Sequence, residues 1–137
     1  MEFKREYYIN KLINKQNNGM IKVITGIRRC GKSYLLNTLF IKYLKKQGID
    51  DSHIIKIDFD SPRNEKYHDA LTLFNYLESL IKDKKTYYFL LDEIQLVNKF
   101  ESVLNGLLRK ENADIYVTGS NSKFLSSAMT SHPLFYA

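Results

Sequence analysis

Cysteine, histidine and long apolar runs are scarce in this sequence. The 137 residues include one cysteine, Cys30, and three histidines. A single cysteine cannot form an internal disulfide, which fits a reducing cytoplasm, and so few sulfur and imidazole ligands argue against a structural zinc site. No apolar run approaches the ~18 residues of a membrane-spanning helix, and no apolar signal core follows the charged N-terminus. We therefore expect a cytoplasmic protein without membrane contact, in which any metal is held by oxygen ligands.

The residues that are abundant are typical of one globular domain. The chain is 44% hydrophobic and 26% charged, at a length that suits a single hydrophobic core. Its formal net charge is +6, and 16 of its 21 basic residues are lysines dispersed along the chain. A basic excess is compatible with a nucleic-acid partner, but the high Lys, Ile and Asn content is also the usage expected of an AT-rich genome. Nucleic-acid binding is therefore an alternative with weak support.

Patterns typical of strands and helices alternate along the chain. Clusters of β-branched and aromatic residues predict strands over 20–25, 54–59, 86–91 and 115–118. Apolar residues at helical spacing predict helices over 3–15, 32–47, 69–81 and 98–110, with Asp69 as an N-cap and Gly48 as a helix terminator. Alternating strands and helices indicate right-handed βαβ units. We therefore expect an α/β fold in which helices cover both faces of a mostly parallel sheet.

A glycine-containing motif lies between the first predicted strand and the next helix. Residues 26–33, G-I-R-R-C-G-K-S, match G-x-x-x-x-G-K-[ST]. The glycines allow a tight turn that presents backbone N–H groups to a phosphate, Lys32 supplies a cation for the β- and γ-phosphates, and the Ser33 hydroxyl is a Mg²⁺ ligand. Arg28 and Arg29 either guard the phosphates or are solvated, and no catalytic role is expected for Cys30. The predicted nucleotide-binding residues are Gly26, Ile27, Arg28, Arg29, Cys30, Gly31, Lys32, Ser33 and Tyr34.

Two carboxylates follow the apolar strand 86–91. Asp92 and Glu93 would lie at the carboxyl edge of a parallel sheet, where ligands bind. Asp92 can hold Mg²⁺ through its water shell, and Glu93 can orient or deprotonate an attacking water. The sequence D-E-I-Q over 92–95 lacks the glycine that GTPases use to sense the γ-phosphate, so adenine is favoured by elimination.

Polar residues also end two other predicted strands. In Thr118-Gly119-Ser120-Asn121, a polar side chain is placed to contact the γ-phosphate and the attacking water, although an ordinary turn with a helix N-cap is the alternative. Asp58 and Asp60 end the strand 54–59, and for them a role in forming the turn is favoured over a place in the site.

The segments G-I-R-R-C-G-K-S, L-L-D-E-I-Q and V-T-G-S-N-S together resemble AAA-type P-loop ATPases of bacteria and archaea, from about Arg5 to Leu125. The resemblance implies a P-loop NTPase fold of the AAA/ASCE type, a three-layer α/β/α sandwich. Residues 1–18 would form an N-terminal helix and residues 19–137 an incomplete ATPase core. The implied ligands are ATP and Mg²⁺. The implied roles are nucleotide and metal binding by Lys32 and Ser33, metal support by Asp92, catalytic base for Glu93, and sensor for Ser120 or else Asn121.

The C-terminal end departs from this pattern. Related ATPases continue with an arginine-containing stretch, a fifth core strand and a lid, whereas no arginine follows Arg109 here. We expect strand 20–25 to lie at an unpaired sheet edge. The resemblance implies a homo-oligomer that meets through the nucleotide face, with an arginine finger from the C-terminal part of the neighbouring subunit. This chain has no arginine there, which puts the finger in doubt.

The expected function is Mg²⁺-dependent ATP binding with slow hydrolysis. The main alternative is a nucleotide-binding switch, or a truncated remnant, without significant turnover. A nucleic-acid-binding module rests only on the lysine excess. A kinase of small metabolites is less favoured because residues 110–137 contain no arginine, in contrast to the arginine-rich lids of such kinases.

Overall fold

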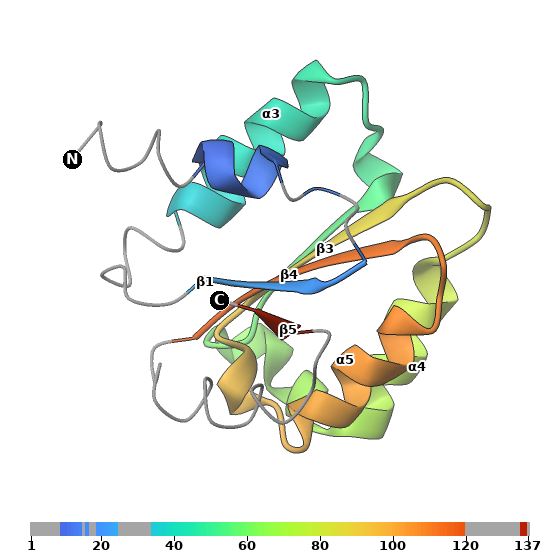
Figure 1. Cartoon of the computed structure of the whole chain (residues 1–137). Helices are drawn as coiled ribbons and strands as arrows, with labels where there is room; N and C mark the ends of the chain where they lie inside the picture. The colour runs from blue at the N-terminus through green and yellow to red at the C-terminus, as the bar shows by residue number, and fades with distance from the viewer. Residues whose placement is uncertain (1–8, 15, 17–18, 25–33, 120–134, 137) are drawn as a thin grey trace.

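A parallel β-sheet forms the centre of the computed structural model (Figure 1). The structure describes residues 9–14, 16, 19–24, 34–119 and 135–136. All strand pairings among these residues are parallel, and the spatial order is β2-β3-β4-β1-β5. The strands are β1 (Ile21–Ile24), β2 (Ile54–Asp58), β3 (Tyr87–Asp92), β4 (Ala113–Thr118) and β5 (Phe135–Tyr136). The predicted α/β fold with a parallel sheet is confirmed.

Helices cover both faces of the sheet (Figure 1). On one face, residues 9–14 are helical beside a continuous helix over 34–46, which consists of a π-helical segment, η1 (Leu35–Phe40), and α3 (Ile41–Lys46). On the other face lie α4 (Ala70–Leu80) and α5 (Phe100–Leu108). Short 3₁₀ segments complete the described helices: η2 (Asp51–His53), η3 (Pro62–His68) and η4 (Ile94–Leu96). None of the helices in these parts of the chain is long and apolar enough to cross a membrane.

Local signals fix where the helices begin and end. The Asp69 carboxylate accepts a hydrogen bond from the Thr72 N–H at 3.0 Å, which confirms the predicted N-cap of α4. Gly48 follows α3 with a φ of 87°, a left-handed conformation that glycine adopts without strain. Helices α4 and α5 approach closely at Gly106, where a Cβ would lie 2.7 Å from the Phe74 ring. A larger residue at position 106 would therefore require the Phe74 ring to shift.

The edge of the sheet corrects one expectation. Ile21 and Lys22 of β1 pair with Phe135 and Tyr136 of β5, so the prediction that strand 20–25 lies at an unpaired edge, without a fifth strand, is wrong. A pairing of two residues is too short to produce the alternation from which a strand is predicted. Strand β1 therefore lies between β4 and β5.

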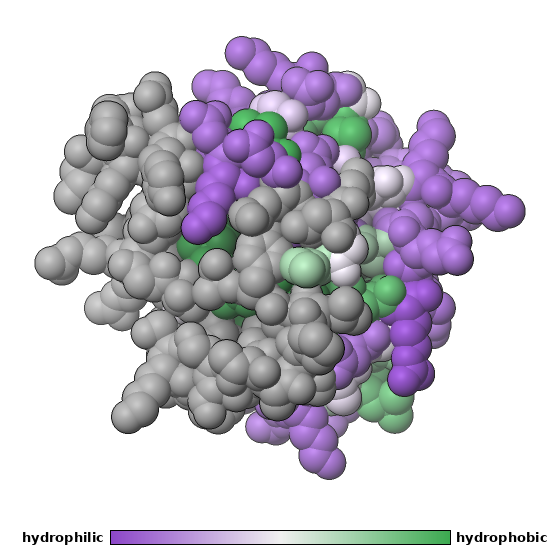
Figure 2. All heavy atoms as spheres, viewed as in Figure 1, coloured by the Kyte–Doolittle hydropathy of each residue, from purple (hydrophilic) through white to green (hydrophobic). Residues whose placement is uncertain are grey.

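Successive residues of each strand contribute to opposite faces. Tyr87, Phe89 and Leu91 of β3 pack in the apolar cluster with α4 and α5, whereas Tyr88 and Leu90 pack in the cluster with the helix 34–46. The same alternation divides β1 and β4. The exterior is more polar: Figure 2 shows mainly hydrophilic residues on the described surface in view. On the face toward helix 34–46, polar residues occur at the two ends of the strands.

At the amino end of that face, Lys22 is buried with Asp114. The Lys22 ammonium forms an ion pair with the Asp114 carboxylate and donates a hydrogen bond to the Met20 carbonyl at 3.0 Å. The Tyr116 hydroxyl donates to the other carboxylate oxygen of Asp114 at 2.7 Å. Burial lowers the pKa of Lys22 below its ordinary value, although the Asp114 carboxylate opposes this shift. Burial therefore imposes a cost on the charged form of this lysine, which the Asp114 carboxylate offsets.

We expect Asp114→Asn to destabilise the chain by about 3–5 kcal/mol, because the Lys22 cation is then buried without a carboxylate. Urea unfolding at pH 7 measures the change. The double variant Lys22→Met/Asp114→Asn removes the buried cation as well and is expected to regain much of the loss. A double variant less stable than Asp114→Asn alone would contradict this interpretation.

Candidate functional site

The structure describes only part of the predicted site. Residues 26–33, including Lys32 and Ser33, lie outside the described residues, as do Ser120 and Asn121. The predicted residues that it does describe are Tyr34, Asp92 and Glu93. Tyr34 is 40% exposed at the start of the helix 34–46. Asp92 and Glu93 are the described centre of the candidate site.

Asp92 ends the central strand β3. All six residues of this strand are buried, and Asp92 itself is 2% exposed. One carboxylate oxygen, Oδ1, accepts a hydrogen bond from the Thr118 hydroxyl on β4. The other, Oδ2, lies 3.4 Å from the Asn37 Nδ2, which donates from the helix 34–46. Two elements on either side of the carboxylate therefore orient it.

Glu93 follows Asp92 in a left-handed backbone conformation. Its φ and ψ are 62° and 50°, values that an L-residue other than glycine adopts at a cost. The Glu93 N–H donates a hydrogen bond to the Thr118 hydroxyl at 3.0 Å, so the same hydroxyl contacts both acidic residues. The Glu93 carboxylate accepts a hydrogen bond from the Gln95 side chain at 2.8 Å. The turn thus holds the carboxylate of a residue that is only 9% exposed.

Two buried amide oxygens lie in the same region without a hydrogen-bond partner among the described residues. They are Asn37 Oδ1 and Gln95 Oε1, and each belongs to a side chain whose amide nitrogen contacts one of the two carboxylates. A buried acceptor that lacks a donor costs ~1–3 kcal/mol. Carboxylate and amide oxygens are also the ligands and hydrogen-bond acceptors that suit a hydrated Mg²⁺ ion. These residues fit the oxygen-based metal site that the sequence predicts.

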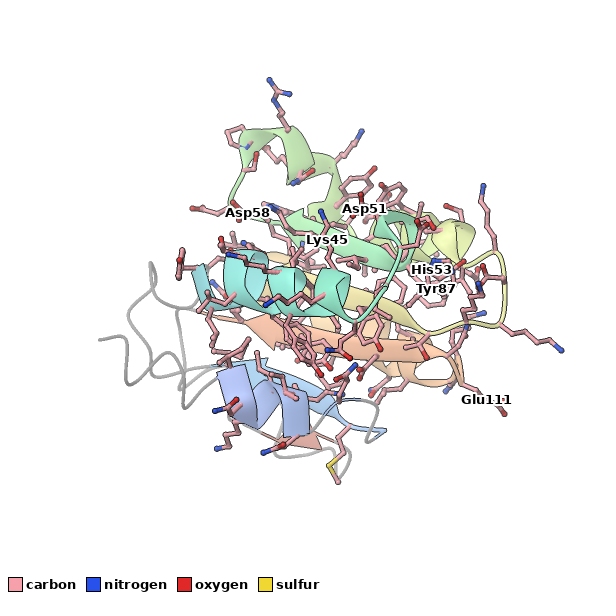
Figure 3. The ribbon with its side chains drawn as sticks, turned by 90° about the horizontal axis from the view of Figure 1, so that it is seen from above. Lys45, Asp51, His53, Asp58, Tyr87 and Glu111 are labelled. Carbon is pink, nitrogen blue, oxygen red and sulfur yellow. The ribbon has the colours of Figure 1, made fainter. Side chains whose placement is uncertain are left out.

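Asp58 is the register partner of Asp92 and ends at the same edge of the sheet, but the hydrogen bonds of its side chain and of Asp60 belong to a turn. The Asp58 carboxylate accepts a hydrogen bond from the Asp60 N–H at 3.0 Å, and the Asp58 carbonyl accepts from the Ser61 N–H at 3.2 Å. These contacts form the turn after β2, as expected from the sequence. Figure 3 shows Asp58 and Tyr87 at opposite ends of the sheet, as required for parallel strands β2 and β3.

The sequence does not predict the contacts that three residues, Thr118, Asn37 and Gln95, make with the two carboxylates. Thr118 belongs to the polar strand end in the sequence, but its hydrogen bonds to Asp92 and Glu93 depend on the pairing of β3 with β4. Asn37 and Gln95 are single amides in otherwise apolar segments. The signal in the sequence for Asn37 is its spacing of four residues from Ser33, the predicted Mg²⁺ ligand.

Comparison with known proteins yields one family and two relatives. The model of a family described as an AAA domain matches residues 18–134. An uncharacterised protein of Haemophilus influenzae is 37% identical over 126 residues, which cover 91% of this chain and 31% of the relative. An uncharacterised protein of Methanocaldococcus jannaschii is 36% identical over 110 residues, which cover 77% of this chain and 22% of the relative. The chain thus spans less than a third of the length of either relative.

A solved structure also resembles this chain. The structure of C. elegans PCH-2 matches it with a TM-score of 0.61 and 18% sequence identity, over 95% of this chain and 39% of that one. At this level of identity the likeness concerns the fold alone.

At Glu93, we expect the glycine variant to be more stable than the alanine variant, which is the reverse of the usual order in a helix. Glu93→Gly and Glu93→Ala both remove the carboxylate, but only glycine adopts a φ of 62° without strain. The glycine variant is expected to be more stable by about 0.5–1 kcal/mol in urea unfolding. Glu101, in helix α5, is the matched control, because there alanine is expected to be the more stable substitution. If the same substitution were the more stable one at both positions, the left-handed conformation of Glu93 would be contradicted.

Removal of the Thr118 hydroxyl is expected to cost more than removal of its methyl group. Thr118→Val leaves the Glu93 N–H and an Asp92 oxygen without this partner, at ~1–3 kcal/mol. Thr118→Ser retains the hydroxyl and loses one buried methyl group, at about 1 kcal/mol. Thermal unfolding compares the two variants. A valine variant as stable as the serine variant would show that the hydroxyl does not connect the strands.

Proposed function

Because the chain belongs to the AAA domain family, we propose that it binds ATP together with Mg²⁺ and hydrolyses the γ-phosphate. Nucleotide binding by a P-loop ATPase-like site is the function at the level of the family. The specific nucleotide, the metal and the hydrolysis are the proposed part.

One contact carries the proposal: the approach of Asn37 Nδ2 to Asp92 Oδ2 at 3.4 Å. It joins the carboxyl end of β3 to the first turns of the helix that follows residues 26–33 in the sequence. Strand β1 ends at Ile24, immediately before the same segment. The acidic pair and the two elements that flank the glycine-containing motif therefore meet at one edge of the sheet, which supports a shared phosphate and metal site.

Each residue has a distinct role in the proposed reaction. Lys32 contacts the β- and γ-phosphates, while Ser33 and Asp92 hold Mg²⁺, which when bound neutralises charge on the phosphate oxygens. Glu93 orients the attacking water and accepts its proton, since the left-handed turn and the Gln95 amide hold its carboxylate in place. Ser120 contacts the γ-phosphate. The water oxygen then bonds to the γ-phosphorus as the bond from that phosphorus to ADP breaks. The products are ADP and inorganic phosphate.

Two substitutions are expected to separate binding from hydrolysis. Lys32→Ala removes a cation from the phosphates and is expected to weaken ATP binding by at least about tenfold in calorimetry. Glu93→Gln retains the size of the side chain but not the base, so ATP affinity is expected to be preserved while phosphate release falls by at least about a hundredfold.

Matched controls lie at the opposite end of the sheet. Lys45 and Glu111 are exposed: Lys45 forms an ion pair at 3.1 Å with Asp51, which precedes β2, and Glu111 precedes β4. Lys45→Ala and Glu111→Gln are expected to bind and hydrolyse ATP as the unsubstituted chain does. Equal ATP affinity for Lys32→Ala and Lys45→Ala would refute the phosphate site. Tight binding by the unsubstituted chain without phosphate release would refute hydrolysis and favour the nucleotide-binding switch.

A further inference from the structure

We propose that Asn37 belongs to the metal site, where its Oδ1 accepts a hydrogen bond from a water molecule bound to the cation at Asp92. This inference rests on the proposed function, because it assumes that the nucleotide arrives with Mg²⁺. It adds a residue of the helix 34–46 to the metal site and gives it a positioning role.

The first observation concerns the nitrogen and the oxygen of the Asn37 side-chain amide, which have different surroundings. Its nitrogen faces Asp92 Oδ2 at 3.4 Å, and its oxygen is buried without a hydrogen-bond partner among the described residues. A rotation that exchanged the two atoms would direct an oxygen at a carboxylate oxygen, which is repulsive. The orientation is therefore set by Asp92, and the amide oxygen is left as an acceptor that requires a donor.

The second observation is that packing fixes the position of Asn37. Its neighbours Leu35 and Leu36 are buried, as is Phe40, and all three pack against the sheet in one apolar cluster. Asn37 also lies within the π-helical segment η1, a helix form that occurs frequently at functional sites. The backbone of Asn37 is therefore held against the sheet, which keeps its half-buried side chain beside Asp92.

The chemistry of the surrounding groups identifies the donor. Asp92 and Glu93 carry carboxylates, and Gln95 Oε1 is a second buried oxygen without a described partner. A phosphate oxygen is an acceptor and cannot satisfy another acceptor. The waters of a hydrated Mg²⁺ ion point their hydrogens outward, and Mg²⁺ keeps several of these waters in protein sites. A hydrated divalent cation is thus the ligand that matches an acceptor beside Asp92.

The test measures how strongly Mg²⁺ favours nucleotide binding, with ADP as the probe so that no turnover occurs. Calorimetry gives the ADP dissociation constant in EDTA and in excess Mg²⁺, and the ratio of the two is the metal dependence. Asn37→Leu retains the bulk of the side chain and removes both polar atoms. Thr38→Ala, at the exposed neighbouring position, is the matched control.

The unsubstituted chain and Thr38→Ala are expected to bind ADP at least about tenfold more tightly in Mg²⁺ than in EDTA. Asn37→Leu is expected to lose at least about tenfold of this metal dependence, as is typical when a group that orients metal ligands is removed. Its ADP affinity in EDTA is expected to stay within about twofold of the unsubstituted value. If Asn37→Leu does not fold, as judged by its thermal transition, Asn37→Ala takes its place.

A third variant separates the two halves of the amide. Asn37→Asp keeps an acceptor oxygen and removes the donor to Asp92, so it is expected to retain the metal dependence. Loss of that dependence in Asn37→Asp, to the extent seen in Asn37→Leu, would show that Asn37 acts only by orienting Asp92, and would overturn the proposal. An unchanged ratio in Asn37→Leu would overturn it while leaving the proposed function intact. A ratio near one in the unsubstituted chain would instead refute metal-dependent binding itself, and this inference with it.

Discussion

The hydroxyl group of Thr118 connects the two strand ends that carry the candidate site. It donates a hydrogen bond to Asp92 and accepts one from the Glu93 N–H, so a side chain on β4 sets both the direction of one carboxylate and the turn that carries the other. The contacts of Asn37 and Gln95 with these carboxylates presuppose that arrangement. The geometry of the site is therefore a result of how β3 pairs with β4, and not of the D-E sequence alone.

Much of the fold follows from local patterns in the sequence. The helices α4 and α5 and the strands β2 and β3 lie within one or two residues of most predicted bounds, because apolar periodicity and the Asp69 cap are properties of neighbouring residues. Strand β4 begins at Ala113, earlier than predicted, since the buried Asp114 does not resemble a strand residue. Strand β5 was not predicted, because its pairing with β1 is a long-range contact of two residues.

The site was predictable to the extent that its residues form motifs. Asp92 and Glu93 lie at the carboxyl edge of the sheet, as the order of strands and helices implies. The contribution of Thr118, Asn37 and Gln95 was not predictable, because each depends on a partner that only the folded chain brings near. The roles of Lys32, Ser33 and Ser120 stay predictions, since these residues lie outside the described parts of the chain.

The buried pair of Lys22 and Asp114 has a consequence for the choice of strand alignment. Because side chains alternate along a strand, a slip of β1 by one residue would turn Lys22 toward the apolar cluster that contains Ile115 and Val117. The cation would then be buried away from Asp114, at a cost of several kcal/mol, whereas the apolar residues of β1 would find similar surroundings on either face. Hydrophobic packing by itself discriminates poorly between these alignments. The charged pair therefore favours the observed alignment over a slip by one residue.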